Sequence, residues 1–478
     1  MNRAAMLARL ADERFDVLVI GGGATGLGCA VDAASRGYRT ALVEANDFAA
    51  ATSSRSTKLV HGGVRYLQEG AVHLVREALH ERTNLLRNAP ALVADRAFLT
   101  PAYRWWESPY YFTGLKLYDV LAGRSEFGHS RYVSRAETLE RLPWLRHDGL
   151  RGSIEYHDGQ FDDARLAIAL ARTAADHGAA IANYSRVTSL LRDGSRLAGA
   201  SVRDEERGAA FDVRAAVTIG AAGIFADDIR RLDDAAAPPI LAHSRGTHVL
   251  VGRDAMPGVD ALLVPKTADG RVLFAIPWHE RVLIGTTDIP VDRAVLDPQP
   301  SDEEIAYLLD TVNGYVERPL DAGAITASFA GLRPLVERGA ASTAKESREH
   351  VVETSRSGLV TIAGGKWTTY RKMAQDAVDA AIASGGLTPA ACITATLRLH
   401  DDTSDELRAL TVQRPELAEP LHAGFSYTKA DVANGYRNEM ARTPDDVLAR
   451  RTRLAFLDAA ATAASRATVV ALQNTERT

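Results

Sequence analysis

A glycine-rich turn between two short apolar segments constrains this chain more than any other feature. Residues 16–44 read DVLVIGGGATGLGCAVDAASRGYRTALVE, in which the run VLVI is typical of a buried parallel strand. In the G-x-G-x-x-G turn, Gly21 permits a tight turn, Gly23 leaves room for a pyrophosphate, and Gly26 lets the next helix pack closely on the strand. The start of that helix favours the negative charge of the phosphates. The segment therefore predicts a βαβ unit that binds a dinucleotide.

An acidic residue ends the second strand of this unit. Glu44 lies roughly 20 residues after the turn, where a carboxylate can accept hydrogen bonds from both ribose hydroxyls of an adenosine. Because a carboxylate at this position repels a 2′-phosphate, NADP is disfavoured. NAD and FAD both remain, and the first βαβ unit alone does not separate them.

Residues 53–68, SSRSTKLVHGGVRYLQ, are unusually basic. They contain Arg55, Lys58, His61 and Arg65, with hydroxyl side chains between them, a glycine pair and no acidic residue. A surface helix would include acids, and a core strand would not carry so many polar groups. The composition of this stretch therefore favours a ligand-binding role.

Two later segments look like parts of the same site. In FAGLRPLVE, Arg333 lies between apolar residues, and residues 358–382 read as an apolar strand, a glycine turn and a helix. Thr368 or Thr369 is expected to cap that helix. In a flavoenzyme, such a helix would stabilise the negative charge gained by the reduced ring. Taken alone, the segment is equally compatible with an ordinary strand–turn–helix.

Composition excludes several classes of protein. A chain of 478 residues predicts two or three domains or one large elaborated domain, and a net charge of −5 argues against a general nucleic-acid binder. The two cysteines, Cys29 and Cys392, have no metal-binding spacing and fit a reducing compartment, so no metal is expected. The N-terminus does not resemble a signal peptide, and the longest nearly apolar run, residues 216–226, is shorter than the ~20 residues of a membrane-spanning helix. We therefore expect a protein that is soluble or, at most, peripherally attached to a membrane.

The chain resembles the FAD-dependent glycerol-3-phosphate dehydrogenase family over nearly its whole length. The matching stretches, in the family's order, are GGGATGLGCAVDAASRGYRTALVE, SSRSTKLVHGGVRYLQ, SPYYFTGLKLYDVLAGRS, YHDGQFDDARLAIALARTAADHGA, SRGTHVLV, LFAIPWHERVLIGTTD, FAGLRPLV and GGKWTTYRKMAQDAVD. The C-terminal stretch that begins LHAGFSYTKADVANGYRNEM also looks like that family's helical extra domain.

The resemblance implies an α/β fold with a Rossmann-like FAD-binding domain, an interleaved mixed-sheet substrate domain and a small C-terminal helical domain. The expected division is 1–92, 159–235 and 341–396 for the FAD-binding domain, 93–158 and 236–340 for the substrate domain, and 397–478 for the helical domain. The family commonly has Pro-Trp where this chain has Ile224 and Phe225, a change expected to alter packing only. The C-terminal region also looks shorter than usual.

Together, the glycine motif and the resemblance give a set of expected FAD contacts. They are Gly21, Gly23, Ala24, Thr25, Gly26, Glu44, Ser53, Ser54, Thr57, His61, Gly62, Gly63, Val187, Gly364, Gly365, Lys366 and Thr368. For Arg55 and Lys58 the sequence leaves two alternatives open: a solvated side chain, or a contact with the FAD pyrophosphate.

The resemblance also implies a substrate site made of arginine and histidine. Arg65, Arg333 and His248 are expected to bind the substrate, since a phosphate suits arginine forks. The alternative for Arg65 is a salt bridge to Glu69. Arg333, Lys366 and His61 are the expected catalytic residues, and the general base is left open between His61 and His248.

Some polar residues in the matching stretches are expected to be structural. Asp162 and Asp163 are predicted to stabilise a helix N-terminus. Residues 286–288, Thr-Thr-Asp, are predicted to close a turn of the substrate sheet, after a strand pair formed by IPW and VLIG.

The implied activity is the oxidation of sn-glycerol 3-phosphate to dihydroxyacetone phosphate by hydride transfer to the flavin, with the electrons passed to a respiratory quinone. The alternatives are an oxidase that makes hydrogen peroxide from oxygen, an amino-acid oxidase of the same superfamily and, last, a flavoprotein without enzymatic activity. The expected partners are the substrate, a quinone and a membrane surface, with a homodimer left open and no nucleic acid. The expected location is cytoplasmic, on the inner face of the cell membrane.

Overall fold

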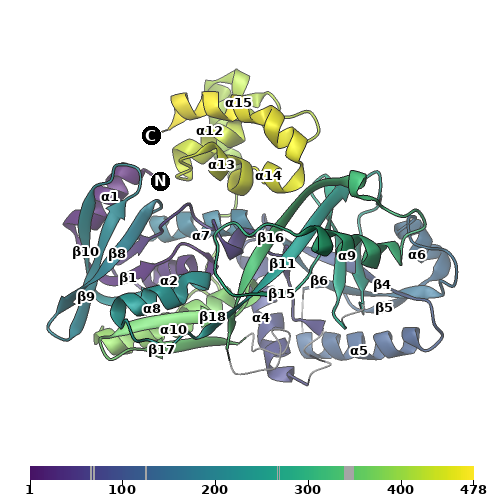
Figure 1. Ribbon diagram of the computed structural model, residues 1–478, viewed down its shortest axis with the longest axis horizontal. Helices are drawn as coiled ribbons and strands as arrows, with labels where there is room; N and C mark the ends of the chain where they lie inside the picture. The colour runs from purple at the N-terminus through teal and green to yellow at the C-terminus, as the bar shows by residue number, and fades with distance from the viewer. Residues whose placement is uncertain are drawn as a thin grey trace.

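The computed structural model describes residues 1–64, 67, 70–123, 126–265, 267, 270–337 and 349–477. Two β-sheets lie side by side, each with helices against it, and a group of helices from the C-terminal part of the chain sits above them (Figure 1). The fold is therefore α/β with two sheets and a separate helical region, as the sequence predicts.

The first sheet contains the predicted βαβ unit at its centre. Strands β18, β10, β1, β2 and β7 are parallel, as a strand–helix–strand connection requires, and the β8–β9 ribbon extends from β10. In spatial order the strands are β17 (His350–Thr354), β18 (Leu359–Gly364), β10 (Ala210–Gly220), β1 (Arg14–Ile20), β2 (Thr40–Val43) and β7 (Ala180–Ala182), with β8 (Ser185–Asp193) and β9 (Arg196–Asp204) in the ribbon.

Helices rich in alanine and glycine cover this sheet. Their small side chains allow close packing, and they share one apolar core with β1 and β2. These helices are α2 (Ala24–Ser35), α7 (Asp163–Asp176) and α10 (Tyr370–Gly385), while α1 (Arg3–Asp12) packs by β7 and α8 (Ala226–Asp233) by β18.

The second sheet is mixed. All of its pairings are antiparallel except that of β4 with β12. Its strands, in spatial order, are β15 (Ile289–Val291), β11 (Leu241–Gly252), β14 (Arg281–Gly285), β13 (Leu273–Trp278), β12 (Ala261–Val264), β4 (Val93–Ala102), β6 (Gly152–Phe161) and β3 (Leu59–Val60), with β16 (Ile325–Val336) on β11 and β5 (Arg131–Ser134) on β6. The helices against it are α4 (Val72–Asn88), α5 (Glu107–Ala122), α6 (Arg135–Arg141) and α9 (Asp302–Asn313).

The chain passes between the two sheets several times. Two details differ from the expected segment limits: β3 lies within residues 1–92 but pairs with β6 of the second sheet, and β6 itself extends to Phe161. The expected hairpin of IPW and VLIG is confirmed, since Trp278 of β13 is opposite Arg281 of β14.

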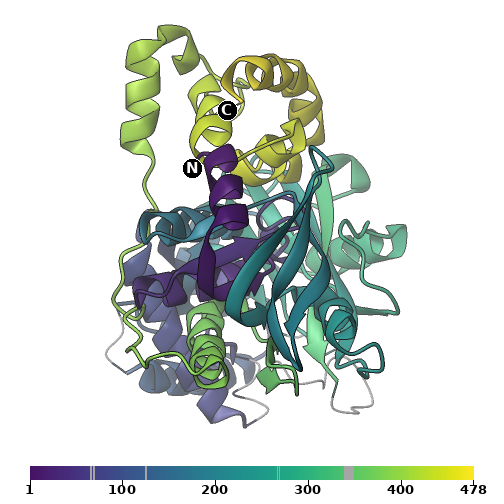
Figure 2. The same ribbon diagram turned by 90° about the vertical axis from the view of Figure 1, so that its left-hand side faces the viewer.

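The C-terminal helices pack against the second sheet. Leu250, Trp278, Leu283 and Phe329 of that sheet belong to the same apolar core as the helical region, which Figure 2 shows rising above the two sheets. The helices are α11 (Ser404–Gln413), α12 (Lys429–Asn438), α13 (Pro444–Asp446), a π-helical turn (Val447–Arg451), α14 (Leu454–Leu457) and α15 (Ala459–Glu476). Within the ranges that the structure describes, no helix combines the length and apolar character needed to cross a membrane.

Candidate active site

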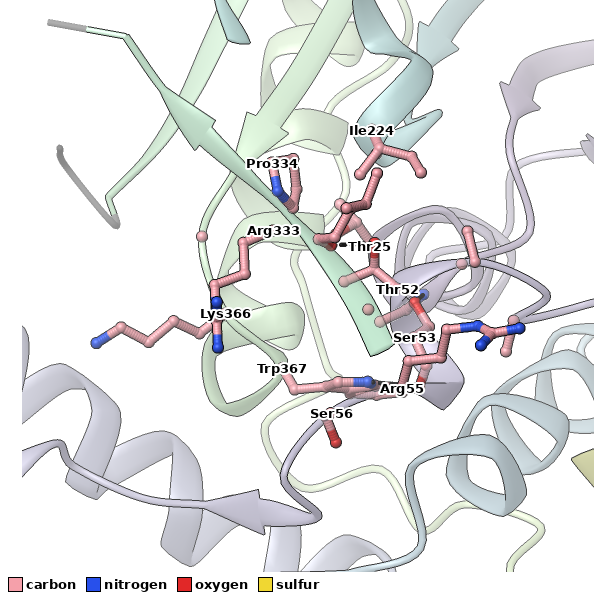
Figure 3. A pocket seen from close by; sticks show the side chains of 18 of the residues that line it. Thr25, Thr52, Ser53, Arg55, Ser56, Ile224, Arg333, Pro334, Lys366 and Trp367 are labelled. Atoms are coloured by element: carbon pink, nitrogen blue, oxygen red, sulfur yellow. Dashed lines mark hydrogen bonds between the residues drawn. The ribbon is translucent and has the colours of Figure 1, made fainter. Parts of the chain in front are cut away.

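A large cavity lies where the two sheets meet, and both sheets contribute to its wall (Figure 3). The first sheet supplies its glycine turn and the segment after β18, and the second supplies β11 and β16. Of the residues expected at the site, those that line the cavity are Gly21, Gly23, Ala24, Thr25, Glu44, Ser53, Thr57, His61, His248, Arg333, Gly364, Gly365, Lys366 and Thr368.

The glycine turn between β1 and α2 has the geometry of a phosphate cradle. Gly21 has φ +115°, and a Cβ there would lie 2.5 Å from the carbonyl oxygen of Ala221. A Cβ on Gly26 would lie 1.9 Å from the carbonyl oxygen of Gly21, so the helix start can approach the turn only without a side chain. Gly23 is different, because a Cβ there would meet only Ser53 Oγ within 4 Å, at 3.1 Å. Its open side faces the cavity, where a pyrophosphate would lie against the helix N-terminus.

Glu44 and Ser53 complete this end of the cavity. The Glu44 carboxylate accepts hydrogen bonds from the backbone N–H of Gly22 at 2.6 Å and of Asn46 at 2.8 Å. Burial raises the pKa of Glu44. The N–H of Ala24, at the start of α2, donates to Ser53 Oγ at 2.9 Å. The turn, the helix start and the carboxylate therefore fit the diphosphate and adenosine ribose of FAD.

A second glycine turn, which follows β18, lines another part of the cavity. Gly364 and Gly365 have φ values of +78° and +76°, and a short 3-10 turn (Trp367–Thr369) leads into α10. The expected N-cap position is confirmed, since Thr369 occupies it, but the Thr369 hydroxyl donates to the carbonyl of Lys366 and makes no capping hydrogen bond to α10. Thr368 Oγ1 instead accepts the N–H of His61 at 3.1 Å and so fixes that part of the basic stretch.

Arg333 projects from β16 into the cavity, as Figure 3 shows, while the long side chain of Lys366 extends away from the other labelled residues. The guanidinium donates to Thr286 Oγ1 at 3.1 Å and to the carbonyl of Thr287 at 3.0 Å, and it lies 3.3 Å from Asp288 Oδ1. Residues 286–288 therefore orient Arg333, a role beyond the turn closure expected of them.

Room for this arginine comes from the neighbouring strand. A Cβ on Gly246 of β11 would lie 2.3 Å from Nη2 of Arg333. Gly246 therefore leaves the space that the guanidinium occupies.

His248 lies on β11 and is almost fully buried. Its Nε2 is 2.9 Å from Thr57 Oγ1, and its ring stacks on Phe329 with the centroids 4.9 Å apart. Burial, and then the charges of Lys58 and Arg333, lower the pKa of His248 well below its usual value. The imidazole is therefore neutral at physiological pH.

Several expected contacts lie away from the cavity wall. The side chain of Ser54 is buried, and the N–H of Gly62 donates to the Tyr118 hydroxyl at 2.7 Å. Within the described part of the chain, the lining of this cavity lacks five of the expected residues: Gly26, Ser54, Gly62, Gly63 and Val187. Val187 belongs to β8. Arg65 and its alternative partner Glu69 lie outside the described residues.

Neither alternative for Lys58 is correct. Its side chain is fully buried behind the wall, where Nζ lies 2.7 Å from Asp163 Oδ2. Burial lowers the pKa of Lys58 to about 7. Asp163 is therefore an ion-pair partner and more than a helix-end charge. Asp162, by contrast, is the N-cap of α7 as expected, because it accepts the N–H of Arg165 at 3.1 Å.

Of the two alternatives for Arg55, the solvated side chain is wrong, because Arg55 lines the cavity and forms an ion pair with Asp297 at 2.7 Å. Two further residues reach the cavity although they were expected to affect packing only. Ile224 and Phe225 also line it, so their difference from the family's Pro-Trp concerns the cavity wall as well as packing. The Pro-Trp comparison was the one sequence signal that marked these positions.

Comparison with known proteins agrees with this site. The model of the FAD dependent oxidoreductase family matches residues 16–371, and the model named C-terminal domain of alpha-glycerophosphate oxidase matches residues 355–477. The mitochondrial glycerol-3-phosphate dehydrogenase of Mesocricetus auratus is 43% identical over 96% of this chain and 70% of its own length. That of Arabidopsis thaliana is 40% identical over 99% of this chain and 85% of its own length.

Solved structures show the same fold. The glycerol-3-phosphate dehydrogenase of Bacillus halodurans, complexed with FAD, has a TM-score of 0.76 and 29% identity and covers 99% of this chain and 96% of its own. The L-alpha-glycerophosphate oxidase of Mycoplasma pneumoniae, with FAD bound, has a TM-score of 0.62 over 77% of this chain and 95% of its own, and at 19% identity it supports the fold alone. The glycine cradle fits the FAD that the family model requires, and FAD is the cofactor. The chain belongs to the FAD-dependent glycerol-3-phosphate dehydrogenase family.

Proposed function

We propose that this protein oxidises sn-glycerol 3-phosphate to dihydroxyacetone phosphate and delivers the electrons to a respiratory quinone. The observation that carries the proposal is the convergence of Arg333 and His248, from adjacent strands, on a cavity that also contains the glycine cradle. An oriented guanidinium suits a phosphorylated or developing carbonyl oxygen, and a neutral imidazole suits a hydroxyl proton. These are the groups that a phosphorylated secondary alcohol needs for oxidation.

FAD, when bound, accepts the hydride that leaves the carbinol carbon. Arg333, which Thr286 and Thr287 hold in place, positions the substrate oxygens and stabilises the charge that develops as the carbonyl forms. We assign the proton-accepting role to His248 at Nε2, with Thr57 as the cavity-lining hydroxyl through which the proton reaches it. His61, anchored by Thr368, lines the same cavity and helps to shape it.

We also propose contact with a membrane surface through the outer face of α5. The large apolar side chains exposed on and beside this helix are Trp105, Trp106, Tyr110, Phe112, Leu117 and Val120. Two of them are strongly exposed, at 74% for Trp105 and 73% for Val120. Tryptophan and tyrosine favour the membrane–water interface, and a lipid-soluble quinone would be reached there. Sedimentation with lipid vesicles tests this surface, and a W105S/V120S variant should sediment less.

Anaerobic mixing of the FAD-loaded protein with sn-glycerol 3-phosphate tests the proposed reaction. Bleaching of the flavin absorbance, reversed rapidly by a soluble quinone analogue and slowly by oxygen, is the expected result. Rapid reversal by oxygen with formation of hydrogen peroxide would instead identify an oxidase. Absence of bleaching in a protein that retains FAD would overturn the substrate assignment.

A further inference from the structure

Three charged side chains form a fully buried cluster behind the cavity wall. Lys58, Asp163 and Arg453 each have 0% of their side chain exposed. Asp163 Oδ2 lies 2.7 Å from Lys58 Nζ, and Asp163 Oδ1 lies 2.9 Å from Arg453 Nη2. Lys58 belongs to the basic stretch, Asp163 begins α7, and Arg453 immediately precedes α14 of the C-terminal helical region. The cluster therefore joins three distant parts of the chain.

This cluster holds the Ser53–Thr57 loop from behind. Asp163 also accepts the N–H of Ser56 at 3.0 Å and the Ser56 hydroxyl at 2.7 Å. The carbonyl of Ser54 accepts hydrogen bonds from Lys58 Nζ at 2.8 Å and from Arg453 Nη2 at 2.9 Å. Because breaking a buried ion pair or hydrogen bond leaves a charged group uncompensated, displacement of the loop from this cluster would be costly.

The other side of the same loop contacts the reaction site. Ser53 Oγ accepts the N–H of Ala24 at the phosphate cradle, and the carbonyl of Ser53 accepts Trp367 Nε1 at 2.9 Å. Thr57 Oγ1 lies 2.9 Å from His248 Nε2. A displacement of the loop would therefore move partners of both the cofactor site and the imidazole.

A second contact from the helical region reaches the imidazole through aromatic rings. Phe456 of α14 packs edge-on against Phe329, with the ring centroids 4.8 Å apart. Phe329 in turn stacks on His248. Lys58 Nζ lies 4.9 Å from the centroid of Phe329 and 5.6 Å from that of Phe456, so the rings and the charged cluster are packed as one unit.

The backbone at both ends of the cluster is unusual. Lys58 has φ +63° and Arg453 has φ +58°, in the left-handed region that residues other than glycine rarely occupy. Such conformations are unfavourable and persist where surrounding contacts hold them. In this cluster, these backbone conformations allow the side chains of Lys58 and Arg453 to reach the same carboxylate, that of Asp163.

We infer that Arg453 and Phe456 are positioning residues for substrate oxidation, so that the C-terminal helical region completes the active site. Arg453 fixes the Ser53–Thr57 loop through Asp163 and Ser54, and Phe456 fixes the His248 ring through Phe329. This inference rests on the proposed reaction, and it assigns to the helical region a part in chemistry that takes place at the junction of the two sheets.

Comparison of Arg453→Met with Arg165→Met tests the inference. Methionine keeps much of the length of Arg453 but removes its hydrogen bonds to the loop. Arg165 forms a two-pronged ion pair with Glu439, at 2.7 Å for both contacts, and so also joins the helical region to α7 without touching the loop. Both variants are measured as FAD-loaded protein for flavin reduction by sn-glycerol 3-phosphate, for the visible circular dichroism of bound FAD and for thermal melting.

The expected result is a separation of the two variants. Arg453→Met should slow flavin reduction at saturating substrate about tenfold or more and change the flavin dichroism, whereas Arg165→Met should lower the melting temperature with a reduction rate within about threefold of wild type. Equal rates for Arg453→Met and wild type, or equal slowing in both variants, would overturn the inference. If Arg453→Met does not fold, Phe456→Leu gives the same comparison without loss of a charge. Failure of the wild type to be reduced would instead concern the proposed reaction.

Discussion

The two sides of the cavity are held in place by different means. On one side, the turn between β1 and α2 is fixed by close packing of backbone: Gly26 has no room for a side chain beside the carbonyl of Gly21, and Gly21 has none beside that of Ala221. On the other side, Arg333 and His248 are held by side chains from separate segments. Substitution of a glycine within the turn is therefore expected to disturb the first side most. The second can fail through substitutions far along the chain.

The largest effect is expected at the locally shaped side. Gly23→Val should nearly abolish FAD binding, because the new side chain would occupy the approach of the pyrophosphate, where even a Cβ already lies 3.1 Å from Ser53 Oγ. We expect affinity to fall by about 1,000-fold or more, roughly 4 kcal/mol, measured by the flavin retained after gel filtration and by titration. Gly114→Ala on α5, where a Cβ would meet nothing within 4 Å, is the matched control. A fully loaded yellow Gly23→Val variant would show that the turn does not hold the cofactor.

Next in size is the effect of removing the guanidinium on the other side. Arg333→Ala should slow flavin reduction by sn-glycerol 3-phosphate about 10²–10³-fold, because the developing carbonyl oxygen loses an oriented cation. FAD should remain bound, since the cradle is built from the turn between β1 and α2 and Arg333 belongs to β16. Anaerobic stopped-flow absorbance measures the rate. Loss of FAD from this variant would mean that the arginine belongs to the cofactor site.

A smaller effect should appear in the pH dependence of stability. His248 has a lowered pKa in the folded protein, so the unfolded chain binds the proton more readily as pH falls below about 6.5. The wild type should therefore lose stability relative to His248→Gln as pH decreases through 6.5, by up to about 1.4 kcal/mol per pH unit. Urea unfolding at pH 7.5, 6.5 and 5.5 measures the difference. A difference that stays constant over this range would show that the buried imidazole titrates normally.

The same contrast explains which features the sequence could predict. The turn from Gly21 to Glu44 was readable because its requirements are local and its spacing is fixed. Arg333 and His248 were assigned to the site mainly through the family resemblance, because the residues next to them in sequence do not indicate which distant side chains they contact. Lys58 and Asp163 were misjudged because a charged side chain is normally exposed, and its burial depends on a partner more than 100 residues away. The wall positions of Ile224 and Phe225 likewise depend on how the two sheets meet.

Contacts within the basic stretch were predicted less well than its overall role. Ser53, Thr57 and His61 line the cavity. In contrast, the N–H of Gly62 donates a hydrogen bond to the Tyr118 hydroxyl, and the side chain of Ser54 is buried. Ser53 and Ser54 lie in a short 3-10 turn, and His61 and Gly62 follow β3, so neighbouring groups of this stretch point in different directions. The composition of such a stretch can therefore indicate a site without showing which members face it.

The order of strands in the first sheet also determines when each strand can find its partner during synthesis. β1 lies between β2 and β10, and Arg14 is paired with Arg214. At synthesis rates of ≈5–20 residues per second, the first strand waits on the order of 10–40 s before its central partner leaves the ribosome. During that interval one edge of a strongly apolar strand has no neighbour in the sheet. An apolar strand with an unpaired edge can pair wrongly or aggregate, so the pace of translation is expected to affect how much protein reaches the native state.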